Sequence, residues 1–252
     1  MPSNGSTFWS PAGRGSASLE VHLLGRVDFD AALFLQEWMV FDVAGRDDTQ
    51  GRLLVCEHPP LISIGREGSR AHLRAEPAEL VARQMEIRWL NRGGGCIVHA
   101  PGQLAVYPVL PLARLGLGLA EYRRRLEESV LDVCRELRLP AERRGEPGVF
   151  CRTGQVAQLA VAVKGWVAYH GLFVNVRPDM RTQRLADPPR PDVQLSSLEA
   201  QRQRPVSMHA IRESLVRNLA SRLEYAEHHV YTGHPLLVRT RRVEGRRLRV
   251  EG

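Results

Sequence analysis

The amino-acid sequence predicts a single α/β domain in which one mixed β-sheet is flanked by helices. The chain has 252 residues, of which 43% are hydrophobic, so it can bury the core of one large domain without disulfides or metals. Stretches with the alternation of strands are interspersed with stretches at helical spacing, an order typical of α/β or α+β proteins. We expect a disordered segment at 1–18, the domain at 19–237 and a basic tail at 238–252.

The first part of the domain begins with an alternating run, Leu19 to Val27, which predicts a strand. Asp28 or Asp30 can cap the helix that follows. The apolar run from Gly51 to Ile64 predicts a buried strand that breaks at Pro59-Pro60, because a double proline cannot sit inside a central ladder.

The remaining elements follow from the same patterns. From Ile87 onward the sequence predicts a strand, a glycine loop and a second strand ending at Pro108 to Pro111. An apolar stripe predicts a helix over Gly118–Leu139. After it we expect a hairpin of Gln155–Val163 and Trp166–Val176 turning at Lys164-Gly165, and a last helix over Met208–Tyr225 that Ser207 caps.

Composition narrows the classes of function. The four cysteines lie far apart without metal-ligand spacing, so we expect reduced thiols and no metal site. The N-terminus lacks the apolar core of a signal peptide and no run of about 20 apolar residues is present, so we expect a cytoplasmic protein that does not enter membranes. We also expect a monomer. The net charge of +7 suits an acidic partner protein better than nucleic acid, because the arginine runs contain almost no aromatic residues for base stacking.

Four motifs occur in a specific order along the chain. They are Glu57-His58-Pro59-Pro60 followed by Ile64-Gly65-Arg66, then Arg92-Gly93-Gly94 with His99, Pro101, Gly102 and Gln103, then Gly148-Val149-Phe150, and finally His170-Gly171 with Asn175-Val176. Together they resemble the octanoyltransferase family, also called lipoate-protein ligase B, over roughly residues 20–225. The resemblance implies a domain like the catalytic domain of biotin and lipoate protein ligases.

The resemblance also implies a reaction and a pocket. The family transfers an octanoyl group from acyl carrier protein to a lysine of a lipoyl domain, through a thioester on a cysteine that a lysine activates, without a cofactor. The implied substrate-binding residues are Arg92, Gly93, Gly94, Gly95, Cys96, Ile97, Val98, His99, Gln158, Leu159, Ala160, Gly171, Leu172 and Phe173. Residues that shape the pocket or support it are Pro101, Gly102, Gln103, His170 and Asn175.

The glycine loop fits this reading physically. Glycines at 93, 94 and 95 allow positive φ and a close approach to a ligand, and we expect them to leave N–H groups free for an acyl oxygen. A tight hairpin with a structural His99 is the alternative interpretation of the same residues. For His170 and Asn175 we favour structural or pocket-wall roles over direct catalysis.

The chain departs from the family pattern at both reacting positions. Gln155 stands where the family has its lysine, and Pro189 falls at or next to the position of its cysteine. Glutamine cannot exchange a proton near neutral pH, and proline has no nucleophile. Lys164 is the only lysine and lies nine residues beyond Gln155. We therefore expect an octanoyltransferase-like protein with impaired chemistry.

Two other functions remain open from the sequence. A working acyltransferase could use a relocated nucleophile, for which Cys96 in the glycine loop and Cys151 before Gln155 are the candidates. A scaffold protein whose pocket is no longer used is the third hypothesis.

Overall fold

The computed structural model describes residues 18–188 and 193–237. Ser18, which we had assigned to the disordered segment, begins the first strand. The other residues of that segment, the basic tail and Pro189 lie outside the described residues.

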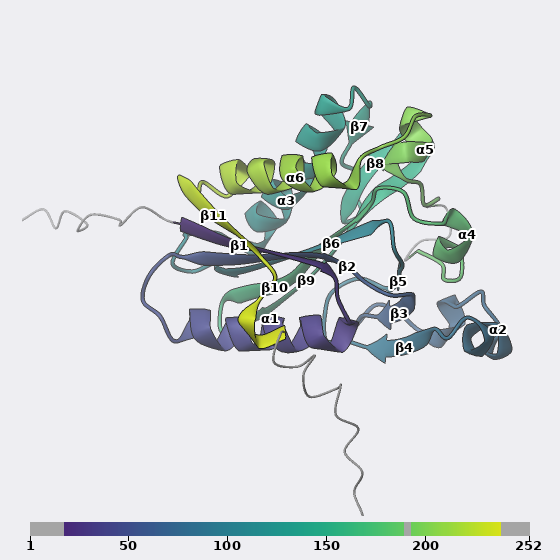
Figure 1. The fold of residues 1–252 in the computed structure, drawn as a ribbon, viewed down its shortest axis with the longest axis horizontal. Coiled ribbons are helices and arrows are strands. Elements are labelled where there is room, and N and C mark those ends of the chain that lie inside the picture. The colour runs from purple at the N-terminus through teal and green to yellow at the C-terminus, as the bar shows by residue number, and fades with distance from the viewer. Residues whose placement is uncertain (1–17, 189–192, 238–252) are drawn as a thin grey trace, which may run out of the picture.

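A mixed sheet of eight strands forms the centre of the fold (Figure 1), as the sequence predicts. Strand β1 is parallel to both of its neighbours, β2 and β11, whereas all other neighbours in this sheet are antiparallel. The order is β11 (Glu227–Thr232), β1 (Ser18–Arg26), β2 (Gly51–Glu57), β6 (Gln103–Pro111), β10 (Val167–Asn175), β9 (Gly154–Lys164), β8 (Gly148–Cys151) and β7 (Ala141–Glu142).

A second sheet of three strands, in the order β4 (Glu86–Trp89), β3 (Leu61–Ile64) and β5 (Cys96–His99), lies at one end of the first. The sequence had indicated one sheet, with 51–64 as an interrupted strand and the segment after the glycine loop as one strand. Each of these segments instead divides between the two sheets, at Pro59-Pro60 and at Pro101-Gly102. Gly102 has a φ of 92°, a conformation that turns the chain sharply and favours glycine.

Helices cover both faces of the large sheet (Figure 1). Helix α1 (Phe29–Ala44) lies on one face, and α3 (Leu119–Glu136) and α6 (Met208–Arg222) lie together on the other. Their caps follow the sequence, since Asp28 accepts from Ala31 N–H at 3.0 Å and Ser207 caps α6. Short helices complete the fold: η1 (Arg70–His72), α2 (Pro77–Ala82), α4 (Met180–Gln183) and α5 (Leu198–Arg202).

The hairpin of β9 and β10 is present, but its turn consists of Gly165 and Trp166, one residue later than the expected Lys164-Gly165. Gly165 and Trp166 both have positive φ, 55° and 59°, as a two-residue type I′ turn requires. Lys164 ends β9 and is exposed at this turn. Strand β11 was not predicted, because its residues are exposed and it pairs with β1, which is about 200 residues earlier in the sequence.

Two further findings concern the described residues only. None of their helices has the length and apolar character that crossing a membrane requires. Their His, Cys, Asp and Glu side chains also form no group that could hold a metal ion.

Candidate functional site

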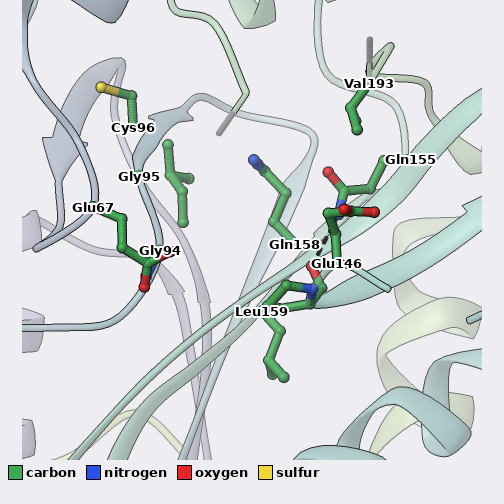
Figure 2. Close-up of a pocket in the computed structure, with 11 residues that line it drawn as sticks. Glu67, Gly94, Gly95, Cys96, Glu146, Gln155, Gln158, Leu159 and Val193 are labelled. Atoms are coloured by element: carbon green, nitrogen blue, oxygen red, sulfur yellow. Dashed lines mark hydrogen bonds between the residues drawn. The ribbon is translucent and has the colours of Figure 1, made fainter. Parts of the chain in front are cut away.

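A cavity of about 250 Å³ lies between the glycine loop before β5 and the first half of β9 (Figure 2). The glycine loop contributes one wall, β9 the opposite wall, and the segment before β8 closes one end. The described residues that line the cavity are Glu67, Gly94, Gly95, Cys96, Ile97, Glu146, Pro147, Gln155, Gln158, Leu159 and Val193.

Arg92 holds the glycine loop from beneath. Its side chain is fully buried, and Nη1 donates to the carbonyl oxygens of Gly93 at 2.9 Å and Gly95 at 3.2 Å. Its Nη2 donates to the carbonyl and hydroxyl oxygens of Ser63 on β3, at 2.9 and 2.7 Å. The planar guanidinium thus ties the loop to the small sheet through several donors at once.

Most N–H groups of this loop are already engaged. Gly93 N–H donates to the carbonyl oxygen of Val161 at 2.9 Å, and Gly94 N–H donates to Glu67 Oε1 at 3.0 Å. The expectation of several free N–H groups is therefore wrong at these two positions. Gly95 N–H has no acceptor among the described residues, so it is the loop donor left for a ligand.

A β-bulge brings two glutamines to the same wall. In a regular strand Gln155 and Gln158, three residues apart, would face opposite sides of the sheet. Between β8 and β9 the register shifts, so that Phe150 pairs with Gln155 and Val149 with Ala157, and Val156 is the extra residue. Because the bulge resets the alternation, both glutamines border the cavity.

The side chain of Gln155 has a fixed orientation. It is only 3% exposed, and Nε2 donates to the carbonyl oxygen of Pro147 at 3.0 Å. Its Oε1 is consequently turned toward the cavity (Figure 2) and has no partner among the described residues. Gly148, whose φ is 133°, makes room for this arrangement, because a Cβ there would lie 2.4 Å from Gln155 Nε2.

Gln158 contributes the second amide. The residue is 5% exposed, and its Oε1 is buried without a hydrogen-bond partner. Its Nε2 also has no partner among the described residues and points into the cavity (Figure 2). Neither end of this amide is satisfied within the described part of the chain.

The two cysteines considered as relocated nucleophiles occupy different surroundings. Cys96 lines the cavity but is 2% exposed, and its Sγ lies 3.6 Å from the carbonyl oxygen of Ser69. Burial raises the pKa of this thiol, which disfavours the thiolate that a nucleophile needs. Cys151 lies in the hydrophobic core beside α3 and does not border the cavity.

The predicted substrate-binding residues fall into three groups. Gly94, Gly95, Cys96, Ile97, Gln158 and Leu159 line it, whereas Gly93 and Ala160 line an adjoining open groove of about 800 Å³. The rest border neither space. Arg92, Val98 and His99 are buried, and Gly171, Leu172 and Phe173 lie on β10, where they pair with Ala160, Leu159 and Gln158 of the neighbouring strand β9.

The predicted supporting residues form buried contacts. Gln103 Nε2 donates to Val98 O and to Asn175 Oδ1, both at 3.0 Å, and so links the two sheets. Gly102 N–H donates to Glu57 Oε2 at 2.7 Å, and the neighbouring Pro101 lies in the same turn, where the chain leaves the small sheet.

Three buried histidines lie behind the site. His99 Nε2 is 2.7 Å from Ser63 Oγ, and His58 Nε2 is 2.8 Å from the hydroxyl of Tyr107. Burial lowers the pKa of His58 to about 4 and that of His170 to about 3, and it lowers the pKa of His99 well below its usual value. These rings are neutral near pH 7 and none of them borders the cavity.

Sequence reasoning missed four residues of the cavity wall: Glu67, Glu146, Pro147 and Val193. Glu67 directly follows the Ile64-Gly65-Arg66 motif and Pro147 directly precedes Gly148, so closeness to a motif was the available signal. No motif lies next to Val193 in the sequence. Its segment reaches β9 through the parallel bridge between Gln155 and Leu195, which the sequence does not reveal.

The sequence matches the lipoyl protein ligase A/B catalytic domain family over residues 28–220. It is 39% identical to an octanoyltransferase of Chloroflexus aurantiacus over 65% of this chain and 74% of the relative. It is 36% identical to an octanoyltransferase of Geobacter metallireducens over 76% of this chain and 87% of the relative.

Solved structures show the same fold at low identity. A bipartite lipoate protein ligase of Thermoplasma acidophilum superposes with a TM-score of 0.67 at 14% identity, covering 88% of this chain and 90% of that one. A lipoate-protein ligase A bound with ATP gives 0.65 at 15% identity, covering 89% and 93%. The chain therefore has the fold of the lipoate protein ligases and belongs to the octanoyltransferase family.

Proposed function

We propose that this chain acts in protein lipoylation by binding octanoyl groups in the cavity beside β9, and that it does not carry out the transfer reaction of its family at an enzymatic rate. The family membership supports a role connected with octanoyl groups and lipoyl domains. The proposed loss of transfer rests on the side chains that occupy the two reacting positions.

The observation that carries this proposal is the position and hydrogen bonding of the Gln155 side chain. The residue replaces the family lysine, and its amide is held on Pro147 O at the cavity wall. A glutamine amide can donate and accept hydrogen bonds but cannot take the proton of a thiol or an incoming amine near neutral pH. The position thus supports binding and not proton transfer.

The sequence offers no lysine close to Gln155 as a replacement. Lys164, the only lysine of the chain, lies at the far end of β9, about 30 Å along a strand that rises about 3.3 Å per residue. The buried Cys96, with its raised thiol pKa, is a poor nucleophile without such a partner.

Acyl carrier protein and lipoyl domains are the proposed partners, and a cytoplasmic location stays a prediction. The net charge of +7 favours binding to acidic proteins through contacts that salt screens. Titration at low and at physiological ionic strength measures this directly. Failure to bind either partner at low salt would favour a scaffold role.

A transfer assay tests the loss of chemistry. The purified chain is incubated with octanoyl-acyl carrier protein and a lipoyl domain, and the modified domain is quantified by mass. The octanoyltransferase of Chloroflexus aurantiacus serves as the positive control. We expect transfer that is slower by roughly 10⁴-fold or more, the scale on which enzymes lose rate when a nucleophile and its base are removed. A rate comparable to the control would reject the proposal.

A further inference from the structure

We infer that the cavity recognises a neutral secondary amide, the linkage of an acylated lysine side chain, in preference to a fatty acid or a thioester. The ligand would be the modified lysine of an acylated protein, with its acyl chain inside the cavity. This inference rests on the proposed function, because it names the form in which the octanoyl group is bound.

The first support is a hydrogen-bond acceptor with a fixed direction. Because Gln155 donates through Nε2 to Pro147 O, its Oε1 is the end that remains for a ligand. The residue is only 3% exposed, and Oε1 is turned into the cavity (Figure 2). An acceptor held in this way matches an N–H donor, which an amide has and a thioester or a carboxylate lacks.

The second support is a donor on the same wall. Gln158 Nε2 points into the cavity and has no partner among the described residues, and Gly95 N–H on the opposite wall also has none. Either group can donate to the carbonyl oxygen of a ligand amide. A buried amide without partners costs about 1–3 kcal/mol, and a ligand that satisfies it recovers part of that cost.

The charges at the cavity disfavour an anionic head group. No Arg, Lys or His is among the described residues that line it, and the Glu67 carboxylate lies on its wall. The nearest buried cation, Arg92, uses its Nη groups on the carbonyls of Gly93, Gly95 and Ser63. A free fatty acid would therefore find no cationic side chain among the described lining residues to pair with its buried carboxylate.

The remaining wall suits the acyl chain. Ile97, Leu159 and Val193 supply apolar surface next to the two glutamines. The volume of about 250 Å³ lies just below the roughly 300–1,000 Å³ of sites for drug-sized ligands, so it fits one acyl chain and its amide better than a chain plus a nucleotide.

The test compares four ligands of the full-length chain by calorimetry. They are Nε-octanoyl-lysine blocked at both ends, the octanoyl thioester of 2-mercaptoethanol, octanoate, and the blocked lysine without an acyl group. We expect the octanoyl-lysine to bind at least about tenfold more tightly than the thioester or octanoate, because one well-placed neutral hydrogen bond accounts for about that factor. The unmodified lysine should not bind.

Two variants test which side chains contact the ligand. Gln155→Leu should weaken octanoyl-lysine binding about tenfold and leave thioester binding within about twofold, because only the amide has an N–H to donate to Gln155 Oε1. Gln158→Leu should weaken the binding of both ligands, because both have the carbonyl oxygen to which Gln158 Nε2 can donate. Gln194→Leu is the matched control, since Gln194 is exposed and does not line the cavity. If either buried variant fails to fold, the comparison of the four ligands on the unaltered chain still tests whether the amide is preferred.

The outcomes separate this inference from the proposed function. Thioester or octanoate binding as tight as octanoyl-lysine binding would overturn amide recognition but leave an acyl-binding cavity in place. No binding of any octanoyl compound would overturn both. Equal losses for octanoyl-lysine and thioester in Gln155→Leu would also contradict a specific contact with the amide N–H.

Discussion

Gly148→Ala should destabilise the protein and displace Gln155. Gly148 has a φ of 133°, outside the range that alanine adopts without strain, and its N–H donates to the buried carboxylate of Glu127 at 2.9 Å. A Cβ at this position would lie 2.2 Å from Ala157 O and 2.4 Å from Gln155 Nε2. The backbone beside the β9 bulge must therefore move to accept a single methyl group.

The expected loss follows from two contributions. A residue forced into a sparsely populated backbone region costs about 1–3 kcal/mol, and overpacking a filled site costs about 1–3 kcal/mol more. The sum, about 2–6 kcal/mol, is a large share of the roughly 5–15 kcal/mol that stabilises a typical domain. The same shift would break the bond from Gln155 to Pro147 O and turn its Oε1 away from the cavity.

Urea unfolding followed by circular dichroism measures the free energy of unfolding of this variant. Gly145→Ala is the matched control, because Gly145 lies in the same loop and a Cβ there meets no atom within 4 Å. We expect the control to stay within about 0.5 kcal/mol of the unaltered chain. Equal stabilities of the two variants would refute the geometry assigned to Gly148.

Three further predictions follow from the buried residues. Gly171→Ala should cost about 3 kcal/mol in urea unfolding, because its Cβ would lie 2.4 Å from Val106 O in the centre of the sheet, and a loss below about 1 kcal/mol would contradict this. The free energy of unfolding should fall as the pH drops below about 6.5, because the unfolded state then binds protons at His58, His99 and His170 that the folded state does not bind. Each histidine contributes about 1.4 kcal/mol per pH unit until the pH reaches its pKa in the folded state. That pKa is about 4 for His58 and about 3 for His170. His170→Asn, which tolerates the positive φ at this position, should reduce that slope by one contribution, and an unchanged slope would count against the assignment. All four cysteines are buried and free, so an aromatic disulfide reagent should label the native chain far more slowly than the urea-unfolded chain, whereas rapid labelling at Cys96 would show an accessible thiol.

The sequence predicted most elements of the fold because each has a local signal. Asp28 and Ser207 mark helix starts, alternation marks the hairpin of β9 and β10, and the order of the motifs indicates the family. The sequence did not predict that the strands divide between two sheets at Pro59 and Pro101. A proline shows where a strand stops, but it does not show with which strand the next segment pairs.

The site was predictable only in part, because it also depends on strand pairing and on contacts between segments distant in the sequence. The glycine loop and Gln158 were identified from motifs, but the bulge at Val156 that puts Gln155 on the same wall depends on pairing with β8. The loop N–H groups were expected to be free, yet Glu67 and Val161, which approach from other segments, accept two of them. Hydrogen-bond partners distant in sequence leave no local pattern.

The central claim, that this member of the octanoyltransferase family lacks the covalent chemistry of the family, is tested most directly by intact-mass spectrometry. The purified chain is incubated with octanoyl-acyl carrier protein, and any adduct is mapped to a peptide. We predict that no octanoyl group is added, because Gln155 and Pro189 stand at the reacting positions, Cys96 is buried, and no basic side chain is among the described residues that line the cavity. An octanoyl adduct on Cys96 or Cys151 that is lost on substitution by serine and is discharged by a lipoyl-domain lysine would contradict the claim.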